Sequence, residues 1–364
     1  MELVEYTRAE ALAKVAAIQA GLERKKKPDQ DAHFFMNQVL DAVERLFIAE
    51  IRERQAAVPG LKTDHLGHVA FLGDELTPGC QHCVDRGLAA IRSSSDCNLT
   101  CDFCYYGETR RSVKLLARDQ FEVEGRPVSS RELKLMLTKA QGGPGALGAL
   151  SWVFLEPFSE FDKHPDLVAF VHELGIHQHL YTNGSLCTRE NLGQLADAGL
   201  EEIRFNLAAT QCSNKVLEAM RIARDLFPYV CIESPMFPEY FERFVAKRAA
   251  ILATGVDHIH CAEIHLNAEI FLKYRSEELY QYSRGYVSPM SSRRLTYDLM
   301  DLAAEEQWSG VTVHDCSNEV KFLRGVSVER FGVLKYQAEL PGVPMWWFRS
   351  ALERYDLTGE GAAD

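Results

Sequence analysis

The sequence predicts an α/β fold, a complete or partial TIM-like barrel with a helical N-terminal extension, from three observations. From about residue 89, short strand-like runs alternate with helix-length segments, which is typical of parallel sheets built from βα units. Six or seven such repeats suit a barrel. The first 58 residues instead have a helical pattern and contain no cysteine. The content of 46% apolar and 25% charged residues is ordinary for a soluble globular protein.

The N-terminal extension is predicted to form two helices. Thr7 and Glu10 fit a capping box at the start of the first helix, which runs to about Glu23. The second helix spans residues 31–55, and its apolar stripe indicates packing on a larger domain. The predicted strands are 89–93, 150–155, 177–181, 202–207, 229–234, 258–266 and 311–314. The predicted helices between them are 130–140, 165–174, 189–198, 214–226, 241–254 and 293–306.

These elements divide the chain into four predicted parts. They are the helical extension 1–58, a cysteine-containing connector 59–88, the barrel 89–320, and a C-terminal extension and tail 321–364. Segments 105–128 and 268–292 are longer than simple connections, and loops of that length often form lids or binding loops. In a barrel of this kind, chemistry gathers where the strands end.

Charge and composition exclude several classes of protein. Forty Lys and Arg against fifty-two Asp and Glu give a net charge of −12, which argues against general DNA binding. No window approaches the roughly 20 apolar residues that span a bilayer. The N-terminus also lacks the basic-then-apolar pattern of a signal peptide. We therefore expect a cytoplasmic protein without a membrane partner, whose ten cysteines serve as thiols for metal binding or catalysis.

Three cysteines share one short loop after the first predicted barrel strand. Cys97, Cys101 and Cys104 have the spacing C-x3-C-x2-C. Three thiolates on one loop can hold three irons of a cubic iron–sulfur cluster, which usually takes four cysteines. One iron would then be open to a substrate or cofactor.

This loop resembles the C-x3-C-x2-aromatic-C motif of the radical S-adenosylmethionine (radical SAM) superfamily, with Phe103 at the aromatic position. The resemblance extends over roughly residues 89–270. Glu156-Pro157 ends the second strand where the family has Gly-Gly-Glu-Pro, residues 180–184 are similar to its Thr-Asn-Gly, and 202–207 to its fourth strand. Phe154-Leu155 replace the two glycines, so we expect the backbone to stay farther from a cofactor than glycine permits.

The resemblance implies that Cys97, Cys101 and Cys104 ligate a [4Fe–4S] cluster whose fourth iron is chelated by S-adenosylmethionine. It implies reductive cleavage to methionine and a 5′-deoxyadenosyl radical, which removes a hydrogen atom from the substrate. A low-potential donor such as flavodoxin or ferredoxin would supply the electron. The implied cofactor-binding residues are Phe103 near the adenine, Glu156 facing the methionyl ammonium, Arg204 or Asn206 at the carboxylate or ribose, and Thr182 and Asn183 of the Thr-Asn-Gly segment.

Polar residues on the later strands predict a hydrophilic substrate pocket. Alternation along residues 258–267 places Cys261, Glu263, His265 and Asn267 on one face, which would be costly in a dry core. Cys231 and Glu233 share a face of the fifth strand, and His314 and Cys316 share one on the last. Such a lining favours a sugar, nucleoside, amino acid or peptide over a lipid.

Catalytic roles on this substrate side follow from residue chemistry. Cys316 or Cys261 could return a hydrogen atom to a substrate radical, although for either cysteine alone a small buried apolar side chain is the favoured interpretation. Glu263, His265 or His314 could act as acid or base. Dehydrogenation, epimerisation, decarboxylation, rearrangement and methyl transfer remain open.

Zinc is the chief alternative. Cys80-x2-Cys83-x17-Cys101-x2-Cys104 fits the zinc-ribbon spacing and would describe a zinc-stabilised binding protein without radical chemistry. This arrangement leaves out Cys97, which completes the tighter pattern. Cys80 and Cys83 could otherwise belong to a second metal site, form a redox pair, or be two packed thiols.

Overall fold

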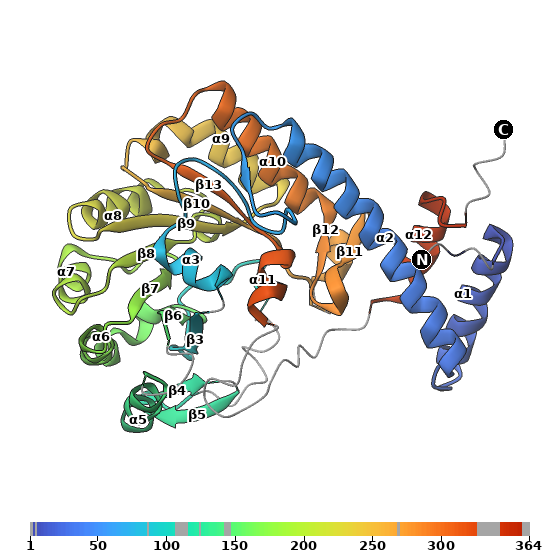
Figure 1. The fold of residues 1–364 in the computed structure, drawn as a ribbon. Coiled ribbons are helices and arrows are strands. Elements are labelled where there is room, and N and C mark those ends of the chain that lie inside the picture. The colour runs from blue at the N-terminus through green and yellow to red at the C-terminus, as the bar shows by residue number, and fades with distance from the viewer. Residues whose placement is uncertain are drawn as a thin grey trace. The chain divides into compact units, whose positions relative to one another are not determined.

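The structure is a computed structural model that describes residues 3, 6–85, 87–105, 116–123, 125–141, 147–267, 270–325 and 343–358 (Figure 1). These residues form two compact units. The first unit comprises the described residues within Met1–Ala57, His265–Ser291 and Ala338–Asp364. The second comprises those within Val58–Ile264 and Ser292–Gln337. The expected division of the chain after residues 58, 88 and 320 stays a prediction.

The second unit is built on an 11-stranded sheet whose centre is parallel. All seven predicted strands are confirmed: β3 (Leu88–Arg92), β6 (Ala149–Val153), β7 (His177–Thr182), β8 (Glu202–Phe205), β9 (Tyr229–Pro235), β10 (His258–Ala262) and β13 (Thr312–Cys316). Beside β13 lie β2 (Ala70–Leu72) and β1 (Lys62–Thr63), and beside β3 lie β4 (Gln120–Val123) and β5 (Arg126–Ser129), all antiparallel. Within the described chain no pairing joins β1 to β5, so the sheet is an open, partial barrel.

Helices lie on both faces of this sheet. The predicted helices are confirmed as α5 (Ser130–Gln141), α6 (Pro165–Glu173), α7 (Arg189–Asp197), α8 (Asn214–Arg224), α9 (Pro238–Leu252) and α10 (Met290–Glu305). Figure 1 shows α6, α7 and α8 on one side of strands β6 to β8, and α3 (Pro78–Val84) on the other side. α11 (Asn318–Gly325) packs against α3. We call the face toward α3 the inner face and the face toward α6 to α8 the outer face.

Strand β10 is shorter than predicted. It ends at Ala262 because its pairing partners end there: Ala262 pairs with Pro235 of β9 and with Cys316 of β13, the last residue of each strand. In the described chain, neither β9 nor β13 therefore pairs with the residues beyond Ala262, and the Leu266 amide instead donates to the Val287 carbonyl at 2.9 Å. The predicted shared face of Cys261, Glu263, His265 and Asn267 is wrong for this reason, since side-chain alternation requires a continuing strand.

The long predicted connections contain short regular elements. The described part of 105–128 includes β4, and 268–292 includes η3 (Phe271–Tyr274), η4 (Tyr282–Arg284) and the hairpin of β11 (Leu279–Gln281) and β12 (Val287–Pro289). The short segments η1 (Pro157–Lys163) and η2 (Ala208–Thr210) follow β6 and β8.

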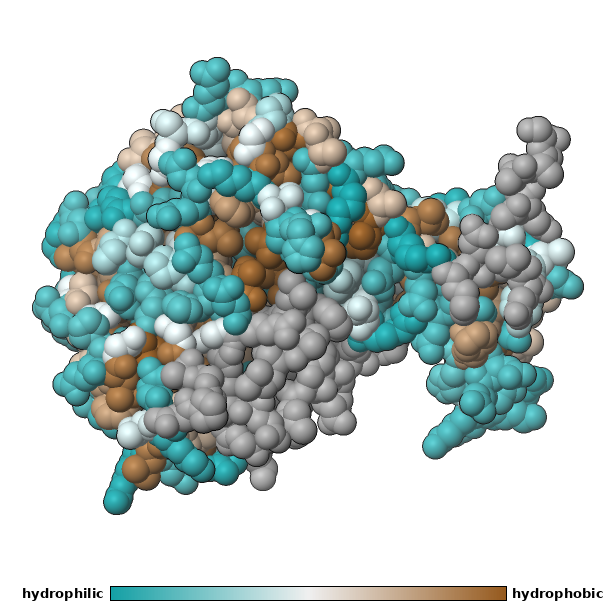
Figure 2. All heavy atoms as spheres, in the orientation of Figure 1, coloured by the Kyte–Doolittle hydropathy of each residue, from teal (hydrophilic) through white to brown (hydrophobic). Residues whose placement is uncertain are grey.

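The surface drawn in Figure 2 is mostly hydrophilic, with apolar atoms in small groups. In the described part of the chain, the exposed large apolar side chains are Leu22, Phe34, Leu46, Leu66, Leu135 and Leu272. None of the helices that the structure describes is long and apolar enough to span a bilayer.

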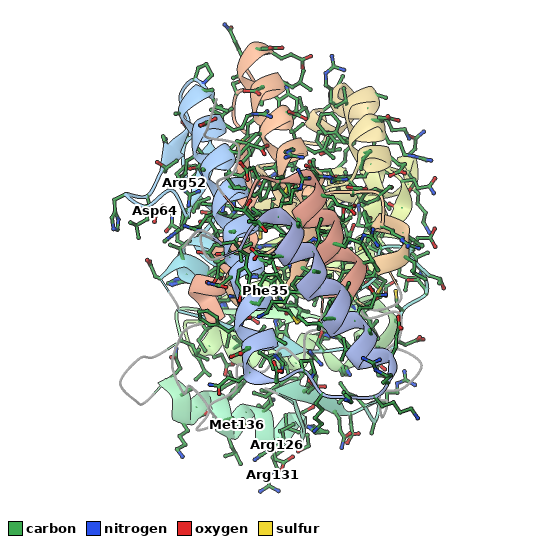
Figure 3. All side chains as sticks on the ribbon, turned by 90° about the vertical axis from the view of Figure 1, so that its right-hand side faces the viewer. Phe35, Arg52, Asp64, Arg126, Arg131 and Met136 are labelled. Atoms are coloured by element: carbon green, nitrogen blue, oxygen red, sulfur yellow. The ribbon has the colours of Figure 1, made fainter. Side chains whose placement is uncertain are left out.

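The first unit contains both predicted N-terminal helices, α1 (Arg8–Glu23) and α2 (Gln30–Ala57), together with α12 (Met345–Arg354). The capping box is confirmed, because the Thr7 hydroxyl accepts from the Glu10 amide and the Glu10 carboxylate accepts from the Thr7 amide. Phe35, labelled in Figure 3, is fully buried, and its ring meets Tyr6 edge-on at 5.3 Å. Helix α2 thus packs through its apolar stripe within the first unit. The expected packing on a larger domain stays a prediction.

Candidate functional site

The loop that follows β3 carries Cys97, Cys101 and Cys104, all of them half-buried. Hydrogen bonds hold this loop against the carboxyl ends of β6 and β7. The Asp96 carbonyl accepts from the Glu156 amide at 3.0 Å. The Asn98 side chain donates to the Ser185 hydroxyl at 2.8 Å and accepts from the Asn183 side chain at 2.9 Å. The cysteine loop therefore meets the segments predicted to bind the cofactor.

The sulfur of Cys97 lies among hydrogen-bond donors. The Leu99 amide is 3.5 Å from Cys97 Sγ, and Asn183 Nδ2 is 3.9 Å from it. Donors directed at a cysteine sulfur favour its thiolate, which is the form that ligates metals. The sequence at this loop is thus suited to a metal ligand.

Glu156 is a fully buried carboxylate at the end of β6. The Thr182 hydroxyl donates to Oε1 at 2.8 Å, the Phe158 amide donates to Oε1 at 3.1 Å, and the Asn183 amide donates to Oε2 at 2.6 Å. Burial raises the pKa of Glu156 to about 7, although these three donors oppose the rise. A buried carboxylate is costly unless it is partnered, so this one is prepared to receive a cation.

The backbone at Phe154 and Leu155 is left-handed although the two glycines of the family pattern are absent. Their φ angles are 85° and 54°, the left-handed region that glycine favours. The chain therefore keeps a glycine-like backbone at this turn despite the two side chains. The expected separation of this backbone from a cofactor stays a prediction. Left-handed conformations cost about 1–2 kcal/mol at each such residue. The Arg92 guanidinium lies 4.8 Å from the centre of the Phe154 ring, and this cation–π contact offsets part of that cost.

Phe103 and Asn206, two of the predicted cofactor contacts, lie beside other strand ends. The Phe103 ring is 5.2 Å from the ring of Phe237, which follows β9. The Asn206 amide donates to the Thr182 carbonyl at 2.8 Å, and its side-chain oxygen accepts from the Ala209 amide at 3.1 Å. Asn206 is thus linked to Thr182, which binds Glu156.

Arg204, the third predicted contact, is the centre of a buried polar network on the inner face. Its guanidinium donates to Glu202 at 2.6 Å and to Glu233 at 2.8 Å, and it lies 3.1 Å from the Tyr181 hydroxyl. Burial disfavours the ionised Glu202, but Arg204 and His177 outweigh burial and hold the pKa of Glu202 well below its ordinary value. The structure thus engages Arg204 with carboxylates of the protein itself.

A cluster of histidines on the same face was missed by sequence reasoning. His258 and His260 alternate along β10 toward the inner face, which also carries His314 of β13 and receives Cys80 from α3. Burial lowers the pKa of His314 to about 3 and raises that of the Cys80 thiol to about 12. The spacing His258-x-His260 could have indicated this cluster, because it places both histidines on one face of the strand. The sequence instead predicts the opposite face, that of Cys261, as the pocket lining.

Cys80, one of the four cysteines of the zinc-ribbon alternative, lies with His260 and His314. Among the residues that the structure describes, no group of converging metal-ligating side chains joins Cys80 or Cys83 to Cys101 or Cys104, and none joins Cys97, Cys101 and Cys104 to one another. The ribbon of four cysteines stays a prediction.

The four residues predicted to be catalytic are not brought together. Cys261 faces outward, with Asp315 and Thr296 of α10 beside it, so it does not line the inner face. The Glu263 carboxylate accepts from the Asn318 amide, and His265 stacks on Tyr286 at 3.7 Å. Cys316, at the end of β13, shares the inner face with His314, and burial raises its pKa well above the ordinary value.

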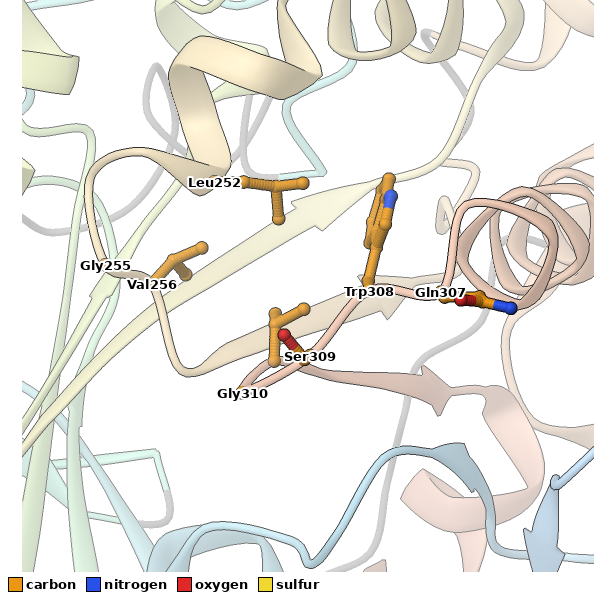
Figure 4. A pocket seen from close by; sticks show the side chains of 8 residues that line it. Leu252, Gly255, Val256, Gln307, Trp308, Ser309 and Gly310 are labelled. Carbon is orange, nitrogen blue, oxygen red and sulfur yellow. The ribbon is translucent and has the colours of Figure 1, made fainter.

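A surface hollow lies at the opposite end of the strands. Its lining comes from the segments that precede β10 and β13, namely Leu252, Gly255, Val256, Gln307, Trp308, Ser309, Gly310 and Val311 (Figure 4). Barrel enzymes use the carboxyl ends of their strands, where the cysteine loop lies. This hollow is therefore not the candidate site.

Comparison with known proteins agrees with the family resemblance of the cysteine loop. A sequence model described as the radical SAM superfamily matches residues 91–246. A protein of Methanocaldococcus jannaschii, named provisionally as a glycyl-radical enzyme activating enzyme, is 28% identical over 138 residues, 36% of this chain. The match spans about a third of that relative, 34% of its length.

Two crystal structures of Streptococcus suis SuiB show a partial structural likeness. The one bound to the precursor peptide SuiA has 13% identity and a TM-score of 0.42, covering 82% of this chain and 64% of that chain. The one bound to S-adenosylmethionine has 13% identity and a TM-score of 0.42, covering 81% and 58%.

Proposed function

We propose, from the match of residues 91–246 to the radical SAM superfamily, that this chain is an enzyme of that superfamily. It would cleave S-adenosylmethionine reductively at a [4Fe–4S] cluster and abstract a hydrogen atom from a polar substrate. The observation that carries this proposal is the contact between the cysteine loop and the buried Glu156. Asn183 links the two, since its amide donates to Glu156 and its side chain to Asn98. The loop and the carboxylate therefore form one site.

The residues present fit both groups. Cys97, Cys101 and Cys104 supply three thiolates from one loop and would leave one iron of a cubic cluster for S-adenosylmethionine. Glu156 would face the methionyl ammonium, because a buried carboxylate held by three neutral donors gains most from a cation. When bound, the two groups supply one-electron cleavage of the sulfonium and hydrogen-atom abstraction.

The protein's own part is to orient and to exclude water. Thr182 and Asn183 fix both oxygens of Glu156, so that the carboxylate needs no rearrangement to receive the ammonium. Phe103 would lie against the adenine, beside Phe237. Asn206 would serve the carboxylate or ribose better than Arg204, whose guanidinium is already engaged by Glu202 and Glu233.

The substrate side of the proposal rests on the polar inner face. Tyr181, Arg204 and Glu233 gather there near the strand ends, which favours a hydrophilic small molecule or a peptide. Cys316 is the proposed hydrogen-atom donor if the reaction inverts a stereocentre, because it ends β13 on this face.

Cys261 faces outward and is not proposed for this role. The acid–base roles of Glu263 and His265 stay predictions. A low-potential donor such as flavodoxin or ferredoxin, in a reducing cytoplasm, completes the proposal.

The test begins with protein purified and reconstituted without oxygen. We expect about four irons and four sulfides per chain, and formation of 5′-deoxyadenosine from S-adenosylmethionine and dithionite. Cys97→Ala, Cys101→Ala and Cys104→Ala should each abolish that product. Cys212→Ala, which removes a buried cysteine elsewhere in the second unit, should retain it. An iron-free wild-type protein after reconstitution, or product formation in the Cys97→Ala variant, would contradict the proposal.

The substrate can then be sought by isotope transfer. Candidate compounds carrying deuterium at the reacting carbon should pass it into 5′-deoxyadenosine when they are substrates. The name of the Methanocaldococcus jannaschii relative adds the backbone of a glycine residue in a partner protein to the candidates. Transfer from a glycine-labelled protein and not from small molecules would favour that class.

A further inference from the structure

Three buried side chains converge on the inner face, and the proposed radical chemistry uses none of them. Cys80 comes from α3, His260 from β10 and His314 from β13. Their exposed fractions are 3%, 0% and 1%. The sequence places Cys80 about 180 and 230 residues from the two histidines, so only the fold brings them together.

The separations between their ligand atoms match a tetrahedral zinc site. Cys80 Sγ lies 3.6 Å from His260 Nδ1 and 3.8 Å from His314 Nδ1, and the two Nδ1 atoms are 3.3 Å apart. With Zn–N of about 2.05 Å and Zn–S of about 2.3 Å, a tetrahedron separates two nitrogens by about 3.35 Å and a nitrogen from a sulfur by about 3.6 Å. One ion can therefore lie at bonding distance from all three atoms.

Hydrogen bonding alone accounts poorly for this arrangement. The two Nδ1 atoms, 3.3 Å apart, form a hydrogen bond only if one of them carries the N–H and the other presents a lone pair. Within the described residues, the Nε2 atoms of His260 and His314 are buried without hydrogen-bond partners. In the described chain no hydrogen bond at Nε2 thus orients either ring, whereas a cation bound by both Nδ1 atoms would.

The groups around Cys80 suit a thiolate that binds a cation. Arg204 Nη2 lies 3.4 Å from Cys80 Sγ and can donate to a thiolate. His177 is shared by Glu201 at 3.3 Å and Glu202 at 3.1 Å, and Arg204 pairs with Glu202 and Glu233. A cation bound to Cys80 would offset the negative charge that the thiolate adds beside these carboxylates. A donor set of two imidazoles and one thiolate selects zinc over magnesium or calcium.

We propose that Cys80, His260 and His314 bind one zinc ion, separate from the cluster held by Cys97, Cys101 and Cys104. The three protein ligands leave the fourth position to a ligand from outside this trio, as in zinc sites that bind water or substrate. This assigns to Cys80 the second metal site that the sequence left open, with ligands that the sequence did not indicate.

Metal analysis of the whole protein, purified without added zinc or chelator, tests the proposal. We expect about one zinc per chain beside the cluster iron. Cys80→Ala and His314→Ala should each lose at least nine-tenths of the zinc and keep the iron. Cys212→Ala should keep both metals. The triple variant Cys97→Ala/Cys101→Ala/Cys104→Ala should lose the iron and keep the zinc, which separates this site from metal bound adventitiously at an unfilled cluster loop.

Cobalt substitution tests the site in the unaltered chain, in case the variants do not fold. After zinc is removed with a chelator, Co²⁺ should produce a sulfur-to-cobalt charge-transfer band and the intense visible bands of tetrahedral cobalt. A folded wild-type protein that holds no zinc and gives no such bands would overturn the site, as would zinc retained by Cys80→Ala. About eight irons per chain with no zinc would also overturn it, since Cys80 would then belong to a second cluster.

Discussion

At the scale of single residues, Glu156 controls both the proposed binding of S-adenosylmethionine and the pH response of the protein without its cofactor. Its pKa is about 7 in the folded chain against an ordinary 4.5, because burial disfavours the ionised form. Between these two values the folded chain keeps a proton that the unfolded chain has released. Stability from this group is therefore complete below pH 4.5 and is lost as the pH rises through about 7.

We predict that Glu156→Gln removes this pH dependence. For the wild-type protein the loss between pH 4.5 and pH 8 is about 3 kcal/mol from Glu156. Urea unfolding of both proteins at pH 5 and pH 8, without cofactor, measures the difference. The variant's advantage should be larger at pH 8 than at pH 5. A difference between the two proteins that stays constant with pH would show that Glu156 ionises at its ordinary pKa.

Thr182 supplies the second residue-level prediction. Its hydroxyl donates to Glu156 at 2.8 Å and accepts from the Gly184 amide at 2.9 Å, and the side chain is buried. Thr182→Val keeps the shape of the side chain but leaves the Glu156 carboxylate and the Gly184 amide without this hydrogen-bond partner. That loss should cost about 1–3 kcal/mol of stability. Thr182→Ser keeps the hydroxyl and loses one methyl group, at about 1 kcal/mol. Unfolding in urea should rank valine below serine; the reverse order would mean that packing dominates at this position.

At the scale of elements, the sequence predicted strands and helices well, but on β10 it did not show which face is inner. Buried parallel strands can have apolar and polar residues on both faces, so alternation along the sequence does not by itself distinguish the inner face from the outer face. On β10 the polar His258 and His260 alternate with Cys261, and only the packing of α3 shows that the histidines face inward. β10 ends where its neighbours β9 and β13 end, and the sequence of β10 alone does not predict the lengths of those neighbours.

Helix α3 gives the prediction that belongs to this scale. It packs so closely on the inner face that a Cβ at Gly79 would lie 2.6 Å from His179 Nδ1 and 2.8 Å from Glu202 Oε2. Gly79→Ala should therefore displace α3 and destabilise the protein by about 1–3 kcal/mol. Gly193→Ala is the matched control, because Gly193 lies in α7 with no atom within 4 Å of the added Cβ.

The control should stabilise the protein by about 0.5–1 kcal/mol, since alanine is the better helix former. Urea unfolding of both variants and of the wild-type protein measures these differences in the free energy of unfolding. If both substitutions raise stability, α3 has room to move, and the inner face is looser than the structure shows.

At the scale of the second unit, one open sheet carries two places for metal on separate strands. The cysteine loop is held by β6 and β7, whereas the Cys80 trio uses α3, β10 and β13. Arg204 on β8 touches Cys80 and ties the trio to Glu202 and Glu233. The first place was predictable because its ligands lie within eight residues of sequence. The second was not, since its ligands meet only after the sheet has formed.

The last prediction concerns the second unit as a whole. A ligand that binds only the folded chain raises its free energy of unfolding by an amount set by the ligand's concentration relative to its dissociation constant, about 2.7 kcal/mol at one hundred times that constant. Addition of S-adenosylmethionine to the reconstituted protein should therefore raise the midpoint of thermal unfolding measured without oxygen. Cys97→Ala should abolish the rise, because no open iron remains, and Glu156→Gln should reduce it, because the ammonium loses its carboxylate. Cys212→Ala should show the full wild-type rise. An equal rise in the Cys97→Ala variant would mean that S-adenosylmethionine binds away from the cysteine loop, which the proposed site does not permit.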